Sequence, residues 1–298
     1  MHIANAPCSW GILEFEETTE RFSGYSKVLD EIAATGYAGT ELGDWGFMPT
    51  DPHQLRAELD RRQLAMLGAF VPIKLASEPA HAPGIETAVR TAKLLAATGA
   101  SPVLVLADDS GTDANRIARA GRIVKADSLS SDEWSTFARG AEAVARAVRD
   151  ETGLRTVFHP HCAGFIETPW EIDELMRRTD PSLLGLCYDT GHISFGGGDP
   201  MKVLQAYMSR IWHVHFKDFN PDAFAQTRAQ SLDYTGAIRL GIFCELGEGN
   251  VDFPSVLQEL QRAQYDGWIV VEQDVLPGMG APAESARRNR EYLQSLGV

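Results

Sequence analysis

Four side chains that can bind a divalent metal each follow a short apolar run in the second half of the sequence. They are His159, Asp189, His215 and Glu272. Two imidazoles and two carboxylates make up a ligand set typical of divalent metals. The four residues can converge only if their strands are parallel, and in a parallel barrel the chemistry lies at the carboxyl ends of the strands. Their types and positions therefore predict a metalloenzyme.

Histidines are concentrated around this set, since five of the eight in the chain lie between residues 159 and 215. A buried histidine is costly unless it is hydrogen-bonded or bound to a metal. The alternative is a group of hydrogen-bonded core histidines, but the two nearby carboxylates favour a metal. His161 shares a strand face with His159, so one of them can bind metal and the other substrate. His215 lies nearer its strand end than His213 and is favoured as the ligand. His213 is expected to contact substrate, and His192 to contact substrate or a carboxylate.

Further residues are candidates for substrate contacts. Trp10 ends the first strand and is predicted either to form an apolar wall for a sugar or cyclitol ring or to be a core aromatic. Glu41 is either an inward polar contact or an ion-pair partner, and Lys74 is a surface lysine whose position permits a substrate contact. Lys217 is expected to point inward and to pair with a substrate oxyanion or with Asp218. Asp274, by contrast, fits a solvent-exposed strand end.

Short apolar runs alternate with longer amphipathic stretches along the chain. The predicted strands are 2–8, 38–43, 64–71, 102–107, 154–159, 183–189, 210–216 and 267–272, and the predicted helices lie near 24–35, 51–63, 84–98, 131–151, 168–178, 200–208, 253–264 and 281–295. This alternation indicates a parallel sheet covered on both faces. Eight such units favour a closed (β/α)8 TIM barrel, formed as one domain by residues 1–298, over an open nucleotide-binding sheet, for which no phosphate-loop motif is present.

Two connections are longer than usual and contain no predicted strand or helix. They are 108–130 and 218–250. Long connections in compact domains are often lids or binding loops. The second contains a mixture of aromatic and cationic residues, namely Phe219, Phe224, Arg228, Tyr234 and Arg239. We expect this segment to close over a polar ligand.

Composition excludes several classes of function. A net charge of −14 argues against nucleic-acid or anionic-membrane binding, since both require a basic face. No apolar run approaches the roughly 20 residues of a membrane span, and the first residues do not resemble a secretory signal. The four cysteines lack CxxC spacing and are expected to be reduced in a cytoplasmic protein, with Cys162 and Cys187 packed in the core rather than bound to the metal. The expected partner is a small molecule, and a homo-oligomer remains open.

Several segments resemble those of one family of barrel enzymes. They are Gly36–Gly43, His159–His161, Leu186–His192, Gly197–Pro200, His213–Asp218, Leu246–Gly249 and Trp268–Glu272. In these motifs the chain resembles the xylose isomerase-like TIM-barrel superfamily of sugar isomerases and epimerases. Within it, the chain is most similar to the inosose (2-keto-myo-inositol) dehydratases of bacterial inositol catabolism. The resemblance covers nearly the whole of the predicted barrel.

The resemblance implies that the superfamily's metal quartet falls on His159, Asp189, His215 and Glu272. Epimerases of this superfamily usually have Glu at the first position, so that two opposed carboxylates move protons on both faces of an enediolate. His159 replaces one of these two bases. A single remaining carboxylate base suits a reaction with one proton abstraction and one leaving group.

The favoured function is a lyase that dehydrates a 2-keto cyclitol with Mn²⁺ or Co²⁺, with Mg²⁺ or Zn²⁺ as alternatives. Glu272 is the first choice for the base that removes the proton α to the ketone. His161 or Glu167 would protonate the departing hydroxyl, and Lys217 would support the developing charge. The alternative on the same barrel is a metal-dependent isomerase or epimerase of a ketose or inosose. A non-catalytic interaction scaffold is the alternative from another class, which the intact metal ligands disfavour.

Overall fold

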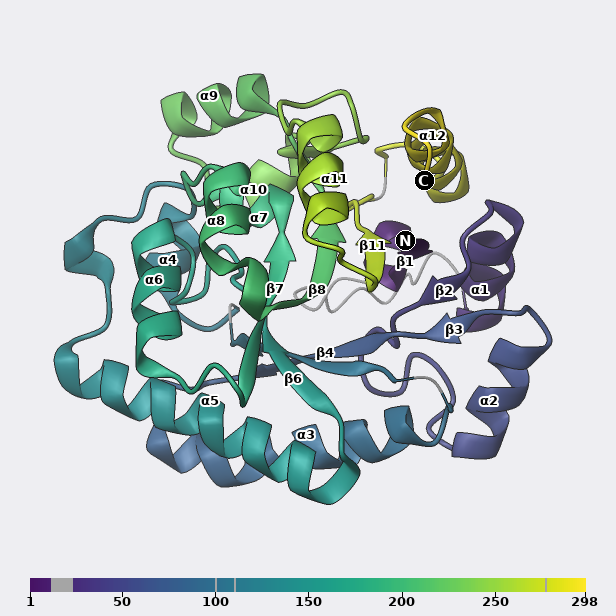
Figure 1. The fold of residues 1–298 in the computed structure, drawn as a ribbon. Helices are drawn as coiled ribbons and strands as arrows, with labels where there is room; N and C mark the ends of the chain where they lie inside the picture. The colour runs from purple at the N-terminus through teal and green to yellow at the C-terminus, as the bar shows by residue number, and fades with distance from the viewer. Residues whose placement is uncertain (12–23, 100, 110, 277) are drawn as a thin grey trace.

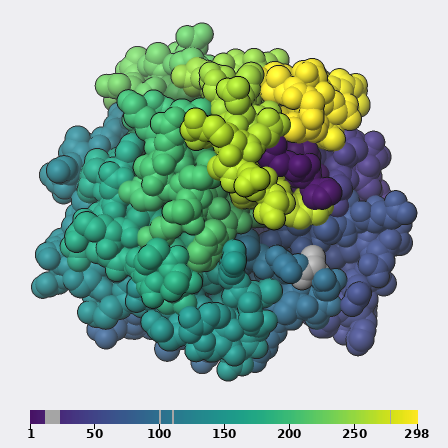
Figure 2. Space-filling model, viewed as in Figure 1, coloured from purple at the N-terminus to yellow at the C-terminus, as the bar shows by residue number. Residues whose placement is uncertain are grey.

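The computed structural model describes residues 1–11, 24–99, 101–109, 111–276 and 278–298. Nine parallel strands form one sheet in the order β3-β2-β1-β11-β8-β7-β6-β5-β4 (Figure 1). They are β1 (His2–Asn5), β2 (Gly39–Thr40), β3 (Ala65–Met66), β4 (Gly68–Ile73), β5 (Val103–Asp108), β6 (Arg155–Phe158), β7 (Leu184–Asp189), β8 (Ile211–Phe216) and β11 (Trp268–Val271). Figure 2 shows the first residues of the chain seated against its C-terminal segments, in agreement with the pairing of β1 with β11.

The sheet closes on itself at Leu67, the single residue between β3 and β4. The Leu67 N–H donates to the Thr40 carbonyl at 3.0 Å, and the Leu67 carbonyl accepts from the Val103 N–H at 2.9 Å. One residue therefore connects the strands on both sides, and β3 and β4 together act as the third of eight barrel strands. The predicted (β/α)8 TIM barrel is confirmed.

Helices surround the strands on the outside of the barrel (Figure 1). The helices that follow the barrel strands are α1 (Tyr25–Ala34), α2 (Pro52–Asp60), α3 (Glu78–Ala96), α5 (Ser131–Thr152), α6 (Pro169–Arg178), α8 (Pro200–Tyr207), α11 (Phe253–Arg262) and α12 (Pro282–Ser295). Helix α5 begins where the sequence predicts, with Ser130 and Glu133 forming a reciprocal capping box. The predicted start of α3 at residue 84 is wrong, because the helix begins at Glu78 and continues through Pro83. Among the described residues, no helix combines the length and apolar character needed to cross a membrane.

The two long connections contain regular structure that hydrophobic periodicity did not indicate. The first contains α4 (Ala114–Arg119), and the second contains β9 (Asp218–Phe219), α9 (Pro221–Gln230), α10 (Tyr234–Arg239) and β10 (Phe243–Cys244). A further short helix, α7 (Thr190–Phe195), follows β7 directly. These helices are short or largely polar, so they lack the long apolar stripe that reveals a helix in a sequence.

Small and large side chains alternate inside the barrel and fill it below the carboxyl ends of the strands. Val105, Val157 and Cys187 pack in one buried cluster against Phe70 and Trp212. Gly185 leaves the space that the Trp212 ring occupies. Because side chains two residues apart share a strand face, the positions after Val157 and Cys187 on this inner face are those of His159 and Asp189. The packed core thus supports the polar residues above it.

The contact between Gly185 and Trp212 can be tested by adding one methyl group. A Cβ on Gly185 would lie 2.4 Å from the Trp212 ring, so the ring or its strand would have to move. We expect Gly185→Ala to lower the free energy of unfolding by about 1–3 kcal/mol, measured by urea denaturation. Gly24→Ala is the control, since nothing lies within 4 Å of its added Cβ. Equal unfolding midpoints for the two variants would contradict the close packing.

Candidate metal and substrate site

The four predicted metal donors meet at the carboxyl end of the barrel. His159 follows β6, Asp189 ends β7, His215 lies on β8 and Glu272 follows β11, and their donor atoms all lie within 4.8 Å of one another. Asp189 Oδ2 is 3.5 Å from His159 Nε2 and 3.7 Å from His215 Nδ1. His215 Nδ1 is 3.2 Å from Glu272 Oε1. Ligands about 2.0–2.2 Å from one tetrahedral ion lie about 3.3–3.6 Å apart, so these spacings suit a single ion.

Buried atoms of this quartet lack hydrogen-bond partners within the described ranges. They are His159 Nδ1, Asp189 Oδ2 and His215 Nδ1, and their side chains are at most 2% exposed. Leaving a buried polar atom without a partner costs about 1–3 kcal/mol. Asp189 Oδ2 and His215 Nδ1 face each other in the middle of the quartet, where a cation would satisfy both. The donor set therefore fits a divalent ion.

Glu41 holds the outer nitrogens of two histidines. Its Oε1 lies 2.7 Å from His213 Nε2 and 3.0 Å from His215 Nε2. With Nε2 of His215 donating to this carboxylate, Nδ1 is the nitrogen presented to the quartet. Burial disfavours the charge on Glu41, but His215 and His213 outweigh it and lower the pKa of Glu41 to about 2. Glu41 thus orients a candidate ligand in addition to lining the cavity.

Lys217 is the buried cation beside the quartet. Its Nζ lies 3.1 Å from Glu272 Oε2, 3.4 Å from Asp274 Oδ1 and 3.4 Å from His192 Nε2. Burial disfavours the negative charge on Glu272. The positive charges of His215 and Lys217 outweigh this effect and hold the pKa of Glu272 well below its usual range. The expectation that Asp274 is solvent-exposed is wrong, because its side chain is buried and contacts Lys217. The two-residue spacing from Glu272 was the signal for this inward direction.

His161 presents a neutral imidazole to the same space. Its Nδ1 lies 2.8 Å from the Cys162 carbonyl, which assigns the ring proton to Nδ1. Burial, followed by the charges of His159 and Lys217, lowers the pKa of His161 to about 3. The ring of His192 lies 4.0 Å from that of His161, and its Nδ1 accepts from the Cys162 N–H at 3.1 Å. His192 therefore contacts both His161 and Lys217 without lining the cavity itself.

These residues open into a cavity of about 200 Å³. Its floor includes His159, His215 and Glu272, and Glu41, His161, Lys217 and Asp274 also line it. One wall is formed by Tyr234, Thr235, Ile238 and Arg239 of α10, and Asp44 after β2 contributes on the other side. The predicted 218–250 connection thus reaches the cavity, although through a helix. Thr235, Ile238 and Asp44 carried no recognisable signal in the sequence.

Four predicted substrate contacts are not among the residues that line this cavity, namely Trp10, Lys74, His192 and His213. Trp10 is 1% exposed, and its indole N–H donates to Glu31 Oε2 at 2.7 Å, so it belongs to the core. Its turn is displaced from the barrel wall because Pro7 begins a 3-10 helix (Pro7–Trp10) instead of extending β1. Lys74 is exposed.

Glu167 lies behind the His159–His161 segment and not in the cavity. Its Oε2 accepts from the Ala163 N–H at 2.9 Å, and its Oε1 accepts from the Gly121 N–H at 2.6 Å. The nearby Glu171 forms a fully buried pair with Arg116 at 2.9 Å. This placement leaves His161 as the better placed of the two predicted acids and makes Glu167 a carboxylate that fixes loops behind the site.

Comparison with known proteins identifies the family. The xylose isomerase-like TIM-barrel family matches residues 29–296. The chain belongs to this family. Its relatives include the inosose dehydratases of Lacticaseibacillus casei, 31% identical over 97% of this chain and 95% of that protein, of Geobacillus kaustophilus, 31% identical over 99% and 94%, and of Salmonella typhimurium, 32% identical over 98% and 94%.

Several solved structures share the fold of this chain. The 3-keto-D-glucoside 4-epimerase YcjR of E. coli superposes with a TM-score of 0.71 at 16% identity over 99% of both chains. The IolI protein, solved with a bound zinc atom, superposes with a TM-score of 0.71 at 14% identity over 99% of this chain and 98% of that one. The probable 3-DHS dehydratase AsbF of Bacillus anthracis gives 0.67 at 17% identity over 99% of both. At these identities the structures establish the shared barrel alone.

Glu167 should make stability depend on pH. Burial is the main cause that raises its pKa from 4.5 to about 7, so the folded protein holds this proton more strongly than the unfolded chain. Relative to a non-titrating Glu167→Gln variant, the wild type should therefore lose stability as pH rises from about 4.5 to 7, by no more than about 3 kcal/mol. Urea midpoints of both proteins between pH 5 and 8 measure this difference.

The matched control is Glu133→Gln at the exposed start of α5. A hydrogen bond from Ser130 lowers the pKa of Glu133, so Glu133 is ionised and contributes its full stabilisation above pH 5. The difference in urea midpoint between Glu133→Gln and wild type should therefore be constant between pH 5 and 8. If the difference in urea midpoint between Glu167→Gln and wild type is equally constant, Glu167 is ionised over the whole range from pH 5 to 8.

Proposed function

We propose that this protein is a hydro-lyase that removes water from a 2-keto cyclitol, with inosose as the substrate. The observation that carries the proposal is the donor set itself, in which His159 stands where the superfamily's epimerases usually have a second carboxylate. Imidazoles of His159 and His161 occupy the β6 side of the cavity, whereas Glu272 and Asp274 lie on the β11 side. The relatives named inosose dehydratase, which match nearly the full length of this chain, support the same substrate class.

A divalent ion would be held by His159, Asp189, His215 and Glu272. Mn²⁺ or Co²⁺ is the favoured ion because the set mixes imidazole and carboxylate ligands, and Mg²⁺ and Zn²⁺ are the alternatives. When bound, such an ion supplies Lewis acidity that polarises a ketone. Glu41 would keep His215 in the orientation required, because it accepts from the opposite nitrogen of that ring.

The protein's own groups would move the protons. Glu272 directs Oε1 toward His215 and Oε2 toward Lys217, so Oε2 is the oxygen placed to take the proton α to the ketone. Lys217 would stabilise the negative charge that develops as this proton leaves. His161, neutral and fixed through Nδ1, would accept a hydrogen bond from the β-hydroxyl at Nε2 and orient it, while the proton taken up by Glu272 passes to that oxygen so that it departs as water.

Other features of this proposal remain predictions. The enzyme is expected to act in the cytoplasm as one barrel domain, and all four cysteines are free of disulfides. An oligomer is left open, and binding of nucleic acid or membranes is not expected. The alternative function is isomerisation or epimerisation of a ketose or inosose on the same barrel, which conserves the mass of the substrate.

Metal content tests the quartet. Asp189 Oδ1 also caps α7 by accepting from the His192 N–H at 2.7 Å, so Asp189→Asn removes the charge while keeping an acceptor for the helix. We expect this variant to hold at least about tenfold less Mn²⁺ or Co²⁺ than wild type after reconstitution and desalting, measured by elemental analysis. Asp199→Asn, at the exposed cap of α8, is the control that should retain wild-type content. Equal metal in all three proteins would show that the ligands lie elsewhere.

Product analysis tests the reaction. Metal-loaded wild-type enzyme should convert 2-keto-myo-inositol to a product lighter by one water, as detected by mass spectrometry. Glu272→Gln should lower turnover by at least about 100-fold, because the amide cannot accept the proton, while it keeps an oxygen for the ion. Glu284→Gln on the exposed face of α12 is the control. A product of unchanged mass would establish the isomerase alternative instead.

A further inference from the structure

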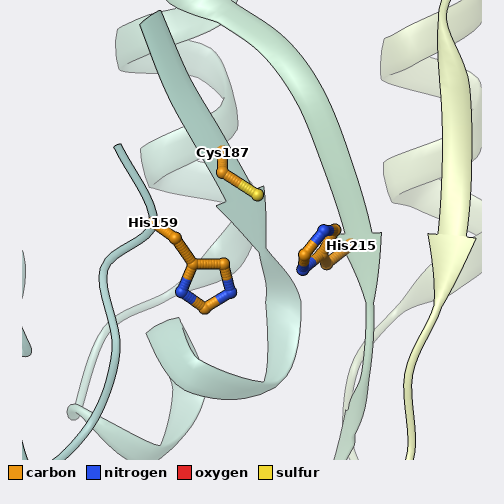
Figure 3. A group of neighbouring side chains, drawn as sticks. All are labelled: His159, Cys187 and His215. Carbon is orange, nitrogen blue, oxygen red and sulfur yellow. The ribbon is translucent and has the colours of Figure 1, made fainter. Parts of the chain in front are cut away.

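Cys187 lies directly beneath the quartet, on the same face of β7 as Asp189. Its side chain is completely buried inside the barrel and does not line the cavity. Two residues along a strand correspond to about 6.6–7 Å, so Cys187 is one layer deeper than Asp189. Figure 3 shows its sulfur directed toward the space between the rings of His159 and His215.

This sulfur and the two imidazoles form a second group of potential ligands. One nitrogen of each ring and the Cys187 Sγ all lie within 4.8 Å of one another. Both histidines are at most 2% exposed, and each has an Nδ1 atom that makes no hydrogen bond in the described part of the chain. Two imidazoles and one thiolate are a ligand set that binds thiophilic ions in preference to Mg²⁺ or Mn²⁺.

We propose that His159, Cys187 and His215 form a second, thiolate-containing metal site that captures Cd²⁺. This site shares both histidines with the upper quartet, so one ion excludes the other. The upper set offers the carboxylates of Asp189 and Glu272, whereas the lower set replaces them with the sulfur of Cys187, which does not line the cavity. An ion held below would occupy the histidines without reaching the substrate.

Binding of an ion by the Cys187 thiolate does not depend on the proposed reaction. Inhibition of the enzyme by thiophilic ions is a further consequence, and it rests on the proposed dehydratase function and on the upper quartet. Ions that prefer oxygen ligands would bind in the upper quartet, and ions that prefer sulfur would bind in the lower site with Cys187. The position of Cys187 would thus set which metals the enzyme can use.

Cadmium absorption tests the site directly. Protein freed of metal with a chelator is titrated with Cd²⁺ alone, and the ultraviolet charge-transfer absorption of a sulfur–cadmium bond is followed. We expect wild type to develop this band with one equivalent of Cd²⁺, and Cys187→Ser to lack it and to bind Cd²⁺ at least about tenfold more weakly. Cys187→Ala serves as a second variant, and circular dichroism establishes that each variant is folded.

Cys162→Ser is the matched control. Cys162 is equally buried near the same end of the barrel, but its Sγ contacts the His192 carbonyl at 3.4 Å and belongs to neither donor group. It should keep the wild-type band. Absence of the band in wild type, its persistence in both Cys187 variants, or its loss in Cys162→Ser would overturn the proposal.

Turnover measured in parallel separates the two proposals. Stoichiometric Cd²⁺ should inhibit the Mn²⁺-loaded wild type more strongly than the Cys187→Ser variant. A sulfur–cadmium band in a protein that does not dehydrate inososes would reject the proposed function and leave the thiolate site intact. Dehydration without the band would reject the thiolate site alone.

Discussion

The structure depends on the concentration of buried carboxylates at one end of the barrel. Glu41, Asp189, Glu272 and Asp274 are all at most 8% exposed, and Lys217 is the buried lysine that lies among them. Buried charge of one sign is expensive unless opposite charge is held nearby. The arrangement of histidines and Lys217 around these groups meets part of that requirement. The remaining attraction for a cation is a property of the barrel itself, built into the residues that end its strands.

The alternation of side chains along each strand explains why the polar groups lie in one layer. Apolar residues such as Val157 and Val270 fill the barrel, and the next residues on the same inner face are His159 and Glu272. The packed core closes this layer to water from below, and its low polarity strengthens the electrostatic interactions at the base of the layer. The helices outside the barrel carry few of these groups; their contribution is to hold the strands in register.

The sequence predicted the barrel and the convergence of its four donor residues because strand ends are visible as apolar runs that stop at a polar residue. It failed where position depends on contacts between distant segments. Trp10 looked suited to a sugar ring, but Glu31 holds its indole in the core. Asp274 looked exposed because it lies beyond the last apolar run, yet the chain continues inward there. The sequence indicated that the 218–250 connection lies near the ligand, but it did not predict α10 there, since a six-residue helix leaves no periodic signal.

The last strand has a consequence for how the protein comes to bind its ligands. β11 pairs with both β1 and β8, so it joins the beginning of the chain to the preceding strand and completes the ring. Glu272 follows directly after it. Glu272 therefore joins the other three donors only when β11 has paired with β1 and β8. A chain whose barrel is not closed has an incomplete set of ligands. Ion binding would then favour the fully assembled barrel over partly formed ones, so that the chemistry of the site also acts as a check on folding.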